Sequence, residues 1–216
     1  MNIHSVMALN VVARRTRPAA APEAPPGPKR DAILRAAIDV FAERGYFNAQ
    51  VADVARVAGV AAGTVYLYFK SKDDLLVSIF ERSMREGLAA GHATVAQITD
   101  PRERLLRLAR GHLARLGSDR NLAIVFQVEL RQSTKFMERF SATLLRDYLG
   151  LIREAIADGQ REGLFRADVK ATVAAKMLFG ALDEMATNWI LSKRRYSLEA
   201  DADAVVDLFI NGARAR

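Results

Sequence analysis

The sequence contains no cysteine, which excludes disulfide bonds and thiolate-ligated metal sites. It has only 3 histidines, His4, His92 and His112, and these are too scattered to predict a metal site. No apolar run approaches the roughly 18 residues of a membrane-spanning helix. The N-terminal charges follow the apolar residues, which is the reverse of a secretory signal peptide. We therefore expect a cytoplasmic protein with no metal, no bound cofactor and no membrane contact.

Enzyme signatures are absent as well. The sequence has no Walker-A phosphate-binding loop, no glycine-rich dinucleotide motif and no G-x-S-x-G nucleophile turn. We therefore expect no catalytic residue and predict that the protein is not an enzyme.

Proline is scarce, with 6 in 216 residues, and several lie between Pro18 and Pro28. Such a tract cannot bury a core, so residues 1–28 are expected to form a disordered tail.

Helical spacing of apolar residues dominates the rest of the chain, and no useful length alternates at the two-residue period of a strand. We predict an all-α fold of about nine helices. Two helix starts carry specific signals: Ser71 begins an S-x-x-D capping box, and Asp100 precedes a proline at the first helical position. The expected helices lie at about 29–44, 51–58, 61–68, 72 into the nineties, 101–116, 120–133, 135–162, 168–192 and 198–213.

The stretch Val51–Phe69 predicts two short helices joined by a tight turn at Gly59. This is the spacing of a helix-turn-helix unit, whose second helix enters a DNA groove. An ordinary helical hairpin is the alternative. The second helix carries small residues at its N-terminus and hydroxyls further on, which suit close approach to phosphates. The predicted DNA-binding residues are Asn48, Gln50, Ala62, Gly63, Thr64, Tyr66, Tyr68, Lys70 and Lys72.

The segment Gly45–Leu76, which includes Gly63-Thr64-Val65-Tyr66, resembles the DNA-binding segment of TetR-class transcriptional regulators. Two positions depart from that resemblance, because Ala49 and Ala61 stand where the family usually has Thr or Ser. We expect Asn48 to cap the second helix in place of the missing hydroxyl. The resemblance implies a regulator whose partners are double-stranded operator DNA and a small-molecule effector.

The resemblance places a helix-turn-helix DNA-binding domain at residues 29–75 and a larger ligand-binding and dimerisation domain at 76–216. The net charge of +7 suits a polyanionic partner but does not single out one domain. Residues 1–75 hold 10 Lys and Arg against 7 Asp and Glu, and residues 76–216 hold 22 against 18. The prediction of DNA binding therefore depends on the motif, and the second domain has positive charge of its own to explain.

Two segments of the second domain, Phe126–Ser133 and Phe179–Trp189, are similar to segments of the TetR-class repressors of fatty-acid degradation. The resemblance implies that a long-chain acyl-CoA releases the protein from DNA, with apolar residues around the tail and arginines at the phosphate head. The alternatives are that the apolar stripe is plain core and that Arg131 pairs with Glu129, Asp183 or Glu184. The candidate ligand-binding residues are Arg107, Phe126, Arg131, Phe140, Leu144, Tyr148, Met177 and Trp189.

The last two expected helices are apolar on faces too broad for a small monomer. The resemblance implies that they form a four-helix bundle in a homodimer, and Val205 and Phe209 are the predicted dimer contacts. We predict a repressor of fatty-acid degradation. A regulator of efflux that binds another bulky apolar ligand is the alternative, and a helical lipid carrier or an unspecific DNA-coating protein belongs to a different class.

Overall fold

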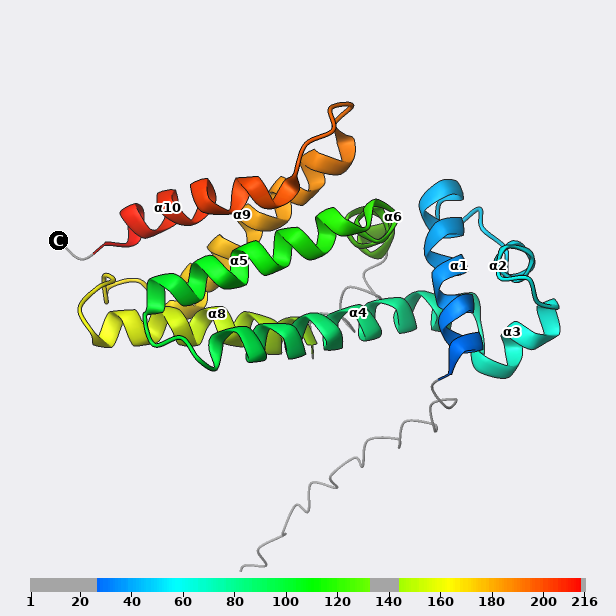
Figure 1. Cartoon of the computed structure of the whole chain (residues 1–216), viewed down its shortest axis with the longest axis horizontal. Coiled ribbons are helices and arrows are strands. Elements are labelled where there is room, and N and C mark those ends of the chain that lie inside the picture. The colour runs from blue at the N-terminus through cyan, green and yellow to red at the C-terminus, as the bar shows by residue number, and fades with distance from the viewer. Residues whose placement is uncertain (1–26, 133–143, 215–216) are drawn as a thin grey trace, which may run out of the picture.

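The computed structural model describes residues 27–132 and 144–214 and shows an all-α protein (Figure 1). The described residues contain nine α-helices and no β-strand, which confirms the predicted fold class. Of the predicted tail at 1–28, residues 1–26 lie outside the described part of the chain. The helices form two groups, a small one at the right of Figure 1 and a larger bundle at the left.

The small group consists of α1 (Pro28–Arg44), α2 (Val51–Val57) and α3 (Ala62–Tyr68). Its core contains Phe41 from α1, Val54 from α2 and Val65 from α3, and each of these is fully shielded from solvent. Helix α1 ends at Gly45, whose φ of +76° is a conformation that side chains other than glycine rarely adopt. The three short helices therefore fold as one unit around a shared apolar centre.

Helix α4 (Lys72–Val95) joins the two groups and belongs to both. The predicted start is confirmed by an N-cap, because the Ser71 hydroxyl accepts a hydrogen bond from the Asp74 N–H at 3.1 Å, but the Asp74 carboxylate accepts from the Lys70 N–H at 2.8 Å and does not complete a capping box with Ser71. Leu75, Leu76 and Ile79 are buried in the core of the small group. The C-terminal half of α4 packs in the bundle, so a movement of this helix affects both groups.

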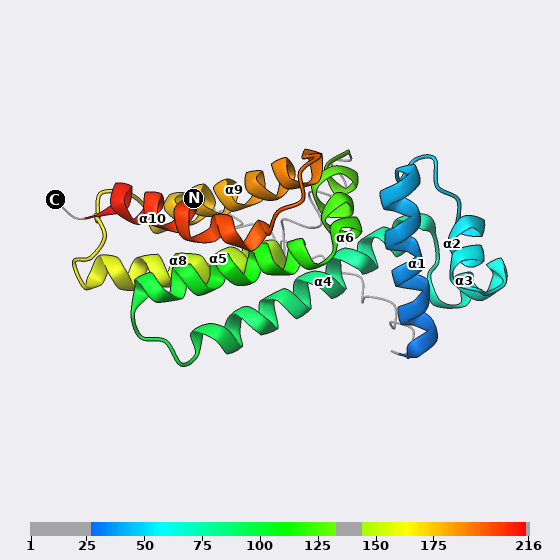
Figure 2. The same cartoon turned by 45° about the horizontal axis from the view of Figure 1, so that its top comes forward.

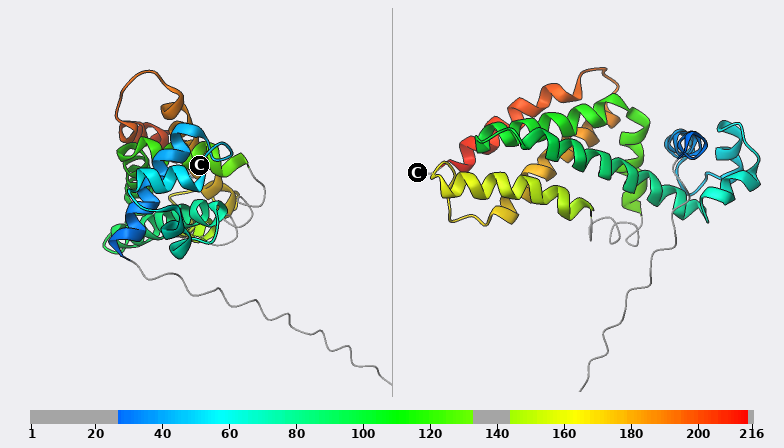
Figure 3. Two further views of the ribbon diagram at one scale, coloured as in Figure 1. Left: turned by 90° about the vertical axis from the view of Figure 1, so that its right-hand side faces the viewer. Right: turned by 60° about the horizontal axis from the view of Figure 1, so that its bottom comes forward.

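The bundle contains α5 (Pro101–Ser118), α8 (Leu144–Arg161), α9 (Ala171–Leu191) and α10 (Asp201–Ala213). Helix α8 packs between α4, α5 and α9, and α10 lies over α5 and α9 (Figures 2 and 3). The predicted start of α5 is confirmed, because the Asp100 carboxylate accepts a hydrogen bond from the Arg102 N–H at 2.9 Å. Large residues from all four helices form the bundle core, including Leu105, Leu113, Ile152, Leu178 and Val206.

One helix differs from the sequence prediction. The range 120–133 was expected to be continuous, but α6 (Arg120–Ile124) passes into the π-helical turn η1 (Val125–Glu129) and then into the 3₁₀ turn η2 (Leu130–Gln132). A π turn rotates the following side chains relative to an α-helix. Val125 and Leu130 are buried in the core of the small group, Gln127 faces the bundle, and Phe126 and Leu130 contact both.

Candidate functional site

The helix-turn-helix unit presents α3 at the protein surface. Helix α2 ends at Val57, and Gly59, with a φ of +67°, makes the tight turn that the sequence predicts. At the start of α2 the Asp53 carboxylate accepts from the Gln50 N–H at 3.1 Å and from the Arg44 guanidinium at 2.8 Å. Hydrogen bonding to Gln50 and the charge of Arg44 lower the pKa of Asp53. The carboxylate therefore stays ionised and holds α2 against the end of α1.

Helix α3 has one buried residue, Val65, which anchors it to the core. The predicted contact residues lie around its other faces. Ala62, Gly63 and Tyr66 are exposed, whereas Thr64 and Tyr68 are half-buried. The side chain of Leu67 is 78% exposed, and sequence reasoning missed it because only polar and small residues were sought. An exposed leucine on a recognition helix suits contact with thymine methyl groups in the major groove.

Asn48 does not cap α2, contrary to the prediction. Its side-chain amide donates to the Arg44 carbonyl oxygen at 3.2 Å, which ties it to the end of α1. Gln50 occupies the N-cap position of α2 and is exposed. Ala61 leads α3 without a side-chain cap, so the first N–H groups of α3 lack a side-chain acceptor from this position.

Lys70 is exposed, but Lys72 has a role that the sequence did not indicate. The Lys72 ammonium donates to three backbone carbonyl oxygens of the segment between α1 and α2, and it lies 4.6 Å from the Tyr46 ring centroid. The three acceptors are Tyr46 at 2.8 Å, Phe47 at 3.1 Å and Ala49 at 2.9 Å. The prediction that Lys72 binds a phosphate is therefore corrected: its donors hold together the base of the helix-turn-helix unit.

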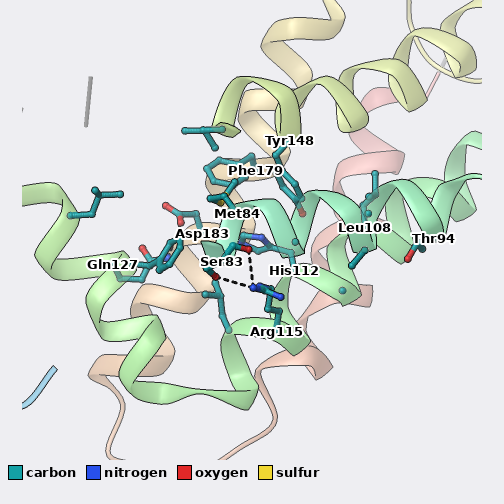
Figure 4. A pocket seen from close by; sticks show the side chains of 18 of the residues that line it. Ser83, Met84, Thr94, Leu108, His112, Arg115, Gln127, Tyr148, Phe179 and Asp183 are labelled. Atoms are coloured by element: carbon teal, nitrogen blue, oxygen red, sulfur yellow. Dashed lines mark hydrogen bonds between the residues drawn. The ribbon is translucent and has the colours of Figure 1, made fainter. Parts of the chain in front are cut away.

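A cavity of about 250 Å³ lies inside the bundle between α4, α5, α8, α9 and the η1 turn (Figure 4). Small residues of α4 and α5 leave the space: Gly87 and Gly91 face it from α4, and Gly111 faces it from α5. An added Cβ at Gly111 would have no neighbouring atom within 4 Å. The other lining residues are Ser83, Met84, Ala90, Thr94, Arg107, Leu108, His112, Arg115, Leu116, Phe126, Gln127, Leu130, Arg131, Leu145, Tyr148, Phe179 and Asp183.

Three rings converge on the centre of this cavity (Figure 4). The ring centroid of His112 lies 5.7 Å from that of Tyr148 and 5.6 Å from that of Phe179. Burial lowers the pKa of His112 from its usual 6.5 to about 4, and burial raises the pKa of Tyr148. Both side chains are therefore neutral at physiological pH. The Nε2 atom of His112 is enclosed and meets no hydrogen-bond partner among the described residues, so it offers a polar contact to a bound molecule.

The lowered pKa of His112 predicts a stability that depends on pH. Between pH 6.5 and about 4 the unfolded chain binds a proton that the folded chain excludes, so stability is complete above 6.5 and declines as pH falls towards 4. Urea unfolding at pH 7.5 and at pH 4.5 measures this loss. We expect wild type to lose about 2–3 kcal/mol more than His112→Phe over this interval. Equal losses of unfolding free energy in the two proteins would contradict the lowered pKa of His112.

The arginines beside the cavity already have carboxylate partners. Arg107 donates to Glu103 at 2.6 Å. Arg115 donates to the Ser83 carbonyl oxygen and to Glu86, both at 2.8 Å. Arg131 pairs with Asp183, which also accepts from the Gln127 amide at 2.8 Å. The structure thus agrees with the ion-pair interpretation of Arg131, and the partner is Asp183.

The structure brings four of the predicted ligand residues to the cavity wall, namely Arg107, Phe126, Arg131 and Tyr148. Phe140 lies outside the described residues, and Leu145 takes the position predicted for Leu144. Two predictions are corrected. Met177 lies on the outer face of α9 and is 62% exposed. Trp189 is buried in the bundle core, where its indole N–H donates to the Tyr196 carbonyl oxygen at 3.0 Å and Arg120 lies over its ring.

The predicted dimer residues lie on α10. Val205 and Phe209 are half-buried because they pack against the core of their own bundle. Leu208, next to Phe209 on the same helix, has a side chain that is 74% exposed. On α9 the exposed apolar residues are Val173, Met177 and Leu191. The dimer contacts of Val205 and Phe209 therefore stay a prediction, and the more exposed apolar residues of the two helices are further candidates.

The η1 turn connects the cavity to the helix-turn-helix unit. Phe126 and Gln127 line the cavity, whereas the carboxylate of Glu129, two residues on, accepts a hydrogen bond from the Tyr46 N–H at 2.7 Å. This bond is buried. The ring of Phe126 also packs edge-to-face on Phe80 of α4 with centroids 4.6 Å apart. A molecule that displaces η1 from inside the cavity therefore also displaces the support of the turn between α1 and α2.

The described ranges 27–132 and 144–214 contain no group of three or more His, Asp or Glu side chains arranged to hold a metal ion. Within the same ranges no single helix is long and apolar enough to cross a membrane. Only α2 and α3 taken together meet that criterion, as a pair bent by 101°.

Two family models match the chain. The model of "Bacterial regulatory proteins, tetR family" matches residues 33–79, and the model of "YsiA-like protein, C-terminal region" matches residues 80–212. Together they cover the helix-turn-helix unit and nearly all of the bundle.

Several known proteins are similar to this chain. The fatty acid metabolism regulator protein of Bacillus subtilis (strain 168) is 35% identical over 185 residues, covering 86% of this chain and 95% of that protein. FadR of Bacillus halodurans, a fatty acid degradation regulator, is 39% identical with a TM-score of 0.82, covering 89% of this chain and 100% of its own. FadR of Bacillus subtilis in complex with stearoyl-CoA is 34% identical with a TM-score of 0.80, covering 85% of this chain and 99% of its own.

Proposed function

Because this chain belongs to the TetR family and is a DNA-binding repressor of that type, we propose that a long-chain acyl-CoA releases it from its operator. The observation that carries the proposal is the cavity inside the bundle. Its wall is mainly apolar and aromatic, and a few polar groups converge on it, as is usual for ligand sites. Its lining includes residues of both segments that resemble the fatty-acid-degradation repressors. A relative that is 34% identical has been crystallised with stearoyl-CoA.

The proposed mechanism is a shift between two populations of the protein. The acyl tail needs more room than the cavity of about 250 Å³ offers, so binding favours a conformation in which α4 and η1 move apart. The hydrogen bond from the Tyr46 N–H to Glu129 and the packing of Phe126 on Phe80 then transmit this change to the helix-turn-helix unit. By linkage, operator DNA weakens the binding of acyl-CoA to the same degree.

We also propose that the working form is a homodimer in the cytoplasm, where a repressor meets its operator. The exposed apolar residues Val173, Met177 and Leu191 lie on α9, and Leu208 lies on α10, which packs beside it (Figure 2). Burying them against a second copy removes them from water, and a symmetric pair of recognition helices reads a two-fold operator.

Operator release by a chain-length series of acyl-CoAs tests the proposed effector. We expect the concentration for half-release to fall by up to about fourfold for each added methylene until the cavity is full, because each buried methylene contributes about 0.8 kcal/mol. Fluorescence anisotropy of a labelled operator, selected from genomic fragments by the protein itself, gives this concentration. Free CoA and free fatty acid serve as controls and are expected to leave the complex intact.

Absence of release at every chain length would reject the acyl-CoA proposal. Release by unrelated bulky apolar cations would instead favour control of efflux. That second candidate has support from the probable acrEF/envCD operon repressor of Escherichia coli (strain K12), which is 25% identical over 189 residues and covers 82% of this chain and 83% of its own.

A further inference from the structure

A second cleft of about 440 Å³ lies between α8 and α9, beside the cavity. Residues spaced by three and four positions line it from one face of each helix, so the cleft follows from how α8 packs on α9. Leu145 and Phe179 line both the cleft and the cavity. A ligand that passes these two side chains occupies both spaces. The other residues that line the cleft are Arg146, Leu149, Gly150, Arg153, Thr172, Ala175 and Lys176.

The cleft is positively charged. Arg146, Arg153 and Lys176 line it, and none of its lining residues, all within the described part of the chain, is acidic. Arg146 and Arg153 meet only the carboxylates of their sequence neighbours, at 3.5 Å and 3.4 Å, and both arginine side chains are about half or more exposed. Two arginines of the cavity differ, because Arg115 and Arg131 pair with carboxylates of other helices, Glu86 and Asp183, whereas Arg107 pairs with Glu103 of its own helix. Part of the surplus positive charge of the second domain therefore lies at this cleft.

We propose that this cleft binds the phosphate head of the acyl-CoA whose tail fills the cavity. The inference rests on the proposed function and names the part of the site that the cavity does not provide. A cavity of about 250 Å³ lies below the roughly 300–1,000 Å³ that drug-sized ligands occupy, and a long-chain acyl-CoA is larger than such ligands. Phosphates form charge-assisted hydrogen bonds with arginine and lysine. The cleft supplies three such cations beside the aromatic end of the cavity, and two of them have only exposed pairs with sequence neighbours at 3.4–3.5 Å to exchange for a phosphate.

The test compares palmitoyl-CoA with S-palmitoyl-pantetheine, which has the same thioester and tail but lacks the nucleotide and its phosphates. Titration calorimetry measures the dissociation constants of both for wild type and for the double variant Arg153→Glu and Lys176→Glu. We expect wild type to prefer palmitoyl-CoA by about tenfold or more, because each exposed ion pair contributes about two- to fivefold in affinity. The double variant is expected to bind the two ligands with nearly equal affinity.

The control is the double variant Lys193→Glu and Arg194→Glu, which makes the same change in net charge on an exposed segment outside both spaces. It is expected to keep the wild-type preference, and equal thermal unfolding midpoints show that both variants are folded. A full preference retained after the cleft charges are reversed would overturn the head site alone. Failure of wild type to bind palmitoyl-CoA would overturn the proposed function and the head site with it.

Discussion

Gly111→Leu is expected to abolish the response to acyl-CoA while operator binding remains intact. Gly111 lines the cavity and no neighbouring atom lies within 4 Å of a new Cβ, so the added side chain has room to reach into the cavity. It displaces about three to four methylenes of the tail at about 0.8 kcal/mol each, which corresponds to about hundredfold weaker binding. Because glycine is a poor residue inside a helix, the substitution also stabilises α5 by up to about 1 kcal/mol.

Gly111→Ala is the matched control for this variant. It brings most of the same gain in helix stability but adds only one methyl group to the cavity. Calorimetry with palmitoyl-CoA and anisotropy with the operator measure the two functions separately. A Gly111→Leu protein that still releases the operator at the wild-type concentration would show that the acyl tail binds elsewhere.

Arginine at Leu208 or Met177 is expected to give a folded monomer that binds the operator weakly. Both side chains are exposed in the single chain, at 74% and 62%, so a charge there costs little in the monomer and much in an apolar interface. Loss of the second recognition helix weakens operator binding by about 10²- to 10⁴-fold, because two linked half-sites gain that much over one. Sedimentation velocity gives the oligomeric state, and anisotropy gives the operator affinity.

Ala93→Arg, at an exposed position of α4, is the matched control and is expected to stay dimeric. Val205→Arg and Phe209→Arg test a different property, because these residues pack against their own core and a charge there destabilises the fold itself. Dimers that persist in both Leu208→Arg and Met177→Arg would exclude this face as the interface.

The fold was largely predictable because its signals are local. Gly59, the N-cap at Ser71 and the start of α5 at Asp100 each act within one helical turn, and the structure has all three as expected. The π turn η1 was not predictable, because its stretch has the apolar content of an ordinary helix. The reason for the turn lies in tertiary structure, since it serves the core of the small group and the bundle at once.

The site was predicted only in part, since tertiary contacts decide which face of a helix meets the cavity. Met177 belongs to the apolar stripe of α9, but packing against α8 and α5 turns Phe179 and Asp183 towards the cavity. His112 was set aside as an isolated histidine, and only its three-dimensional neighbours reveal its position. Lys72 carries the charge of a phosphate ligand, but its acceptors lie more than twenty residues earlier in the chain.

A crystal structure of the protein with stearoyl-CoA tests the central claim most directly, because it locates the tail and shows the state of η1. We predict that the tail lies among Met84, Tyr148 and Phe179 and that η1 has shifted. The 2.7 Å bond between the Tyr46 N–H and Glu129 should then be lengthened or lost. A tail bound outside the bundle, or a filled cavity with η1 and this bond unchanged, would contradict the account.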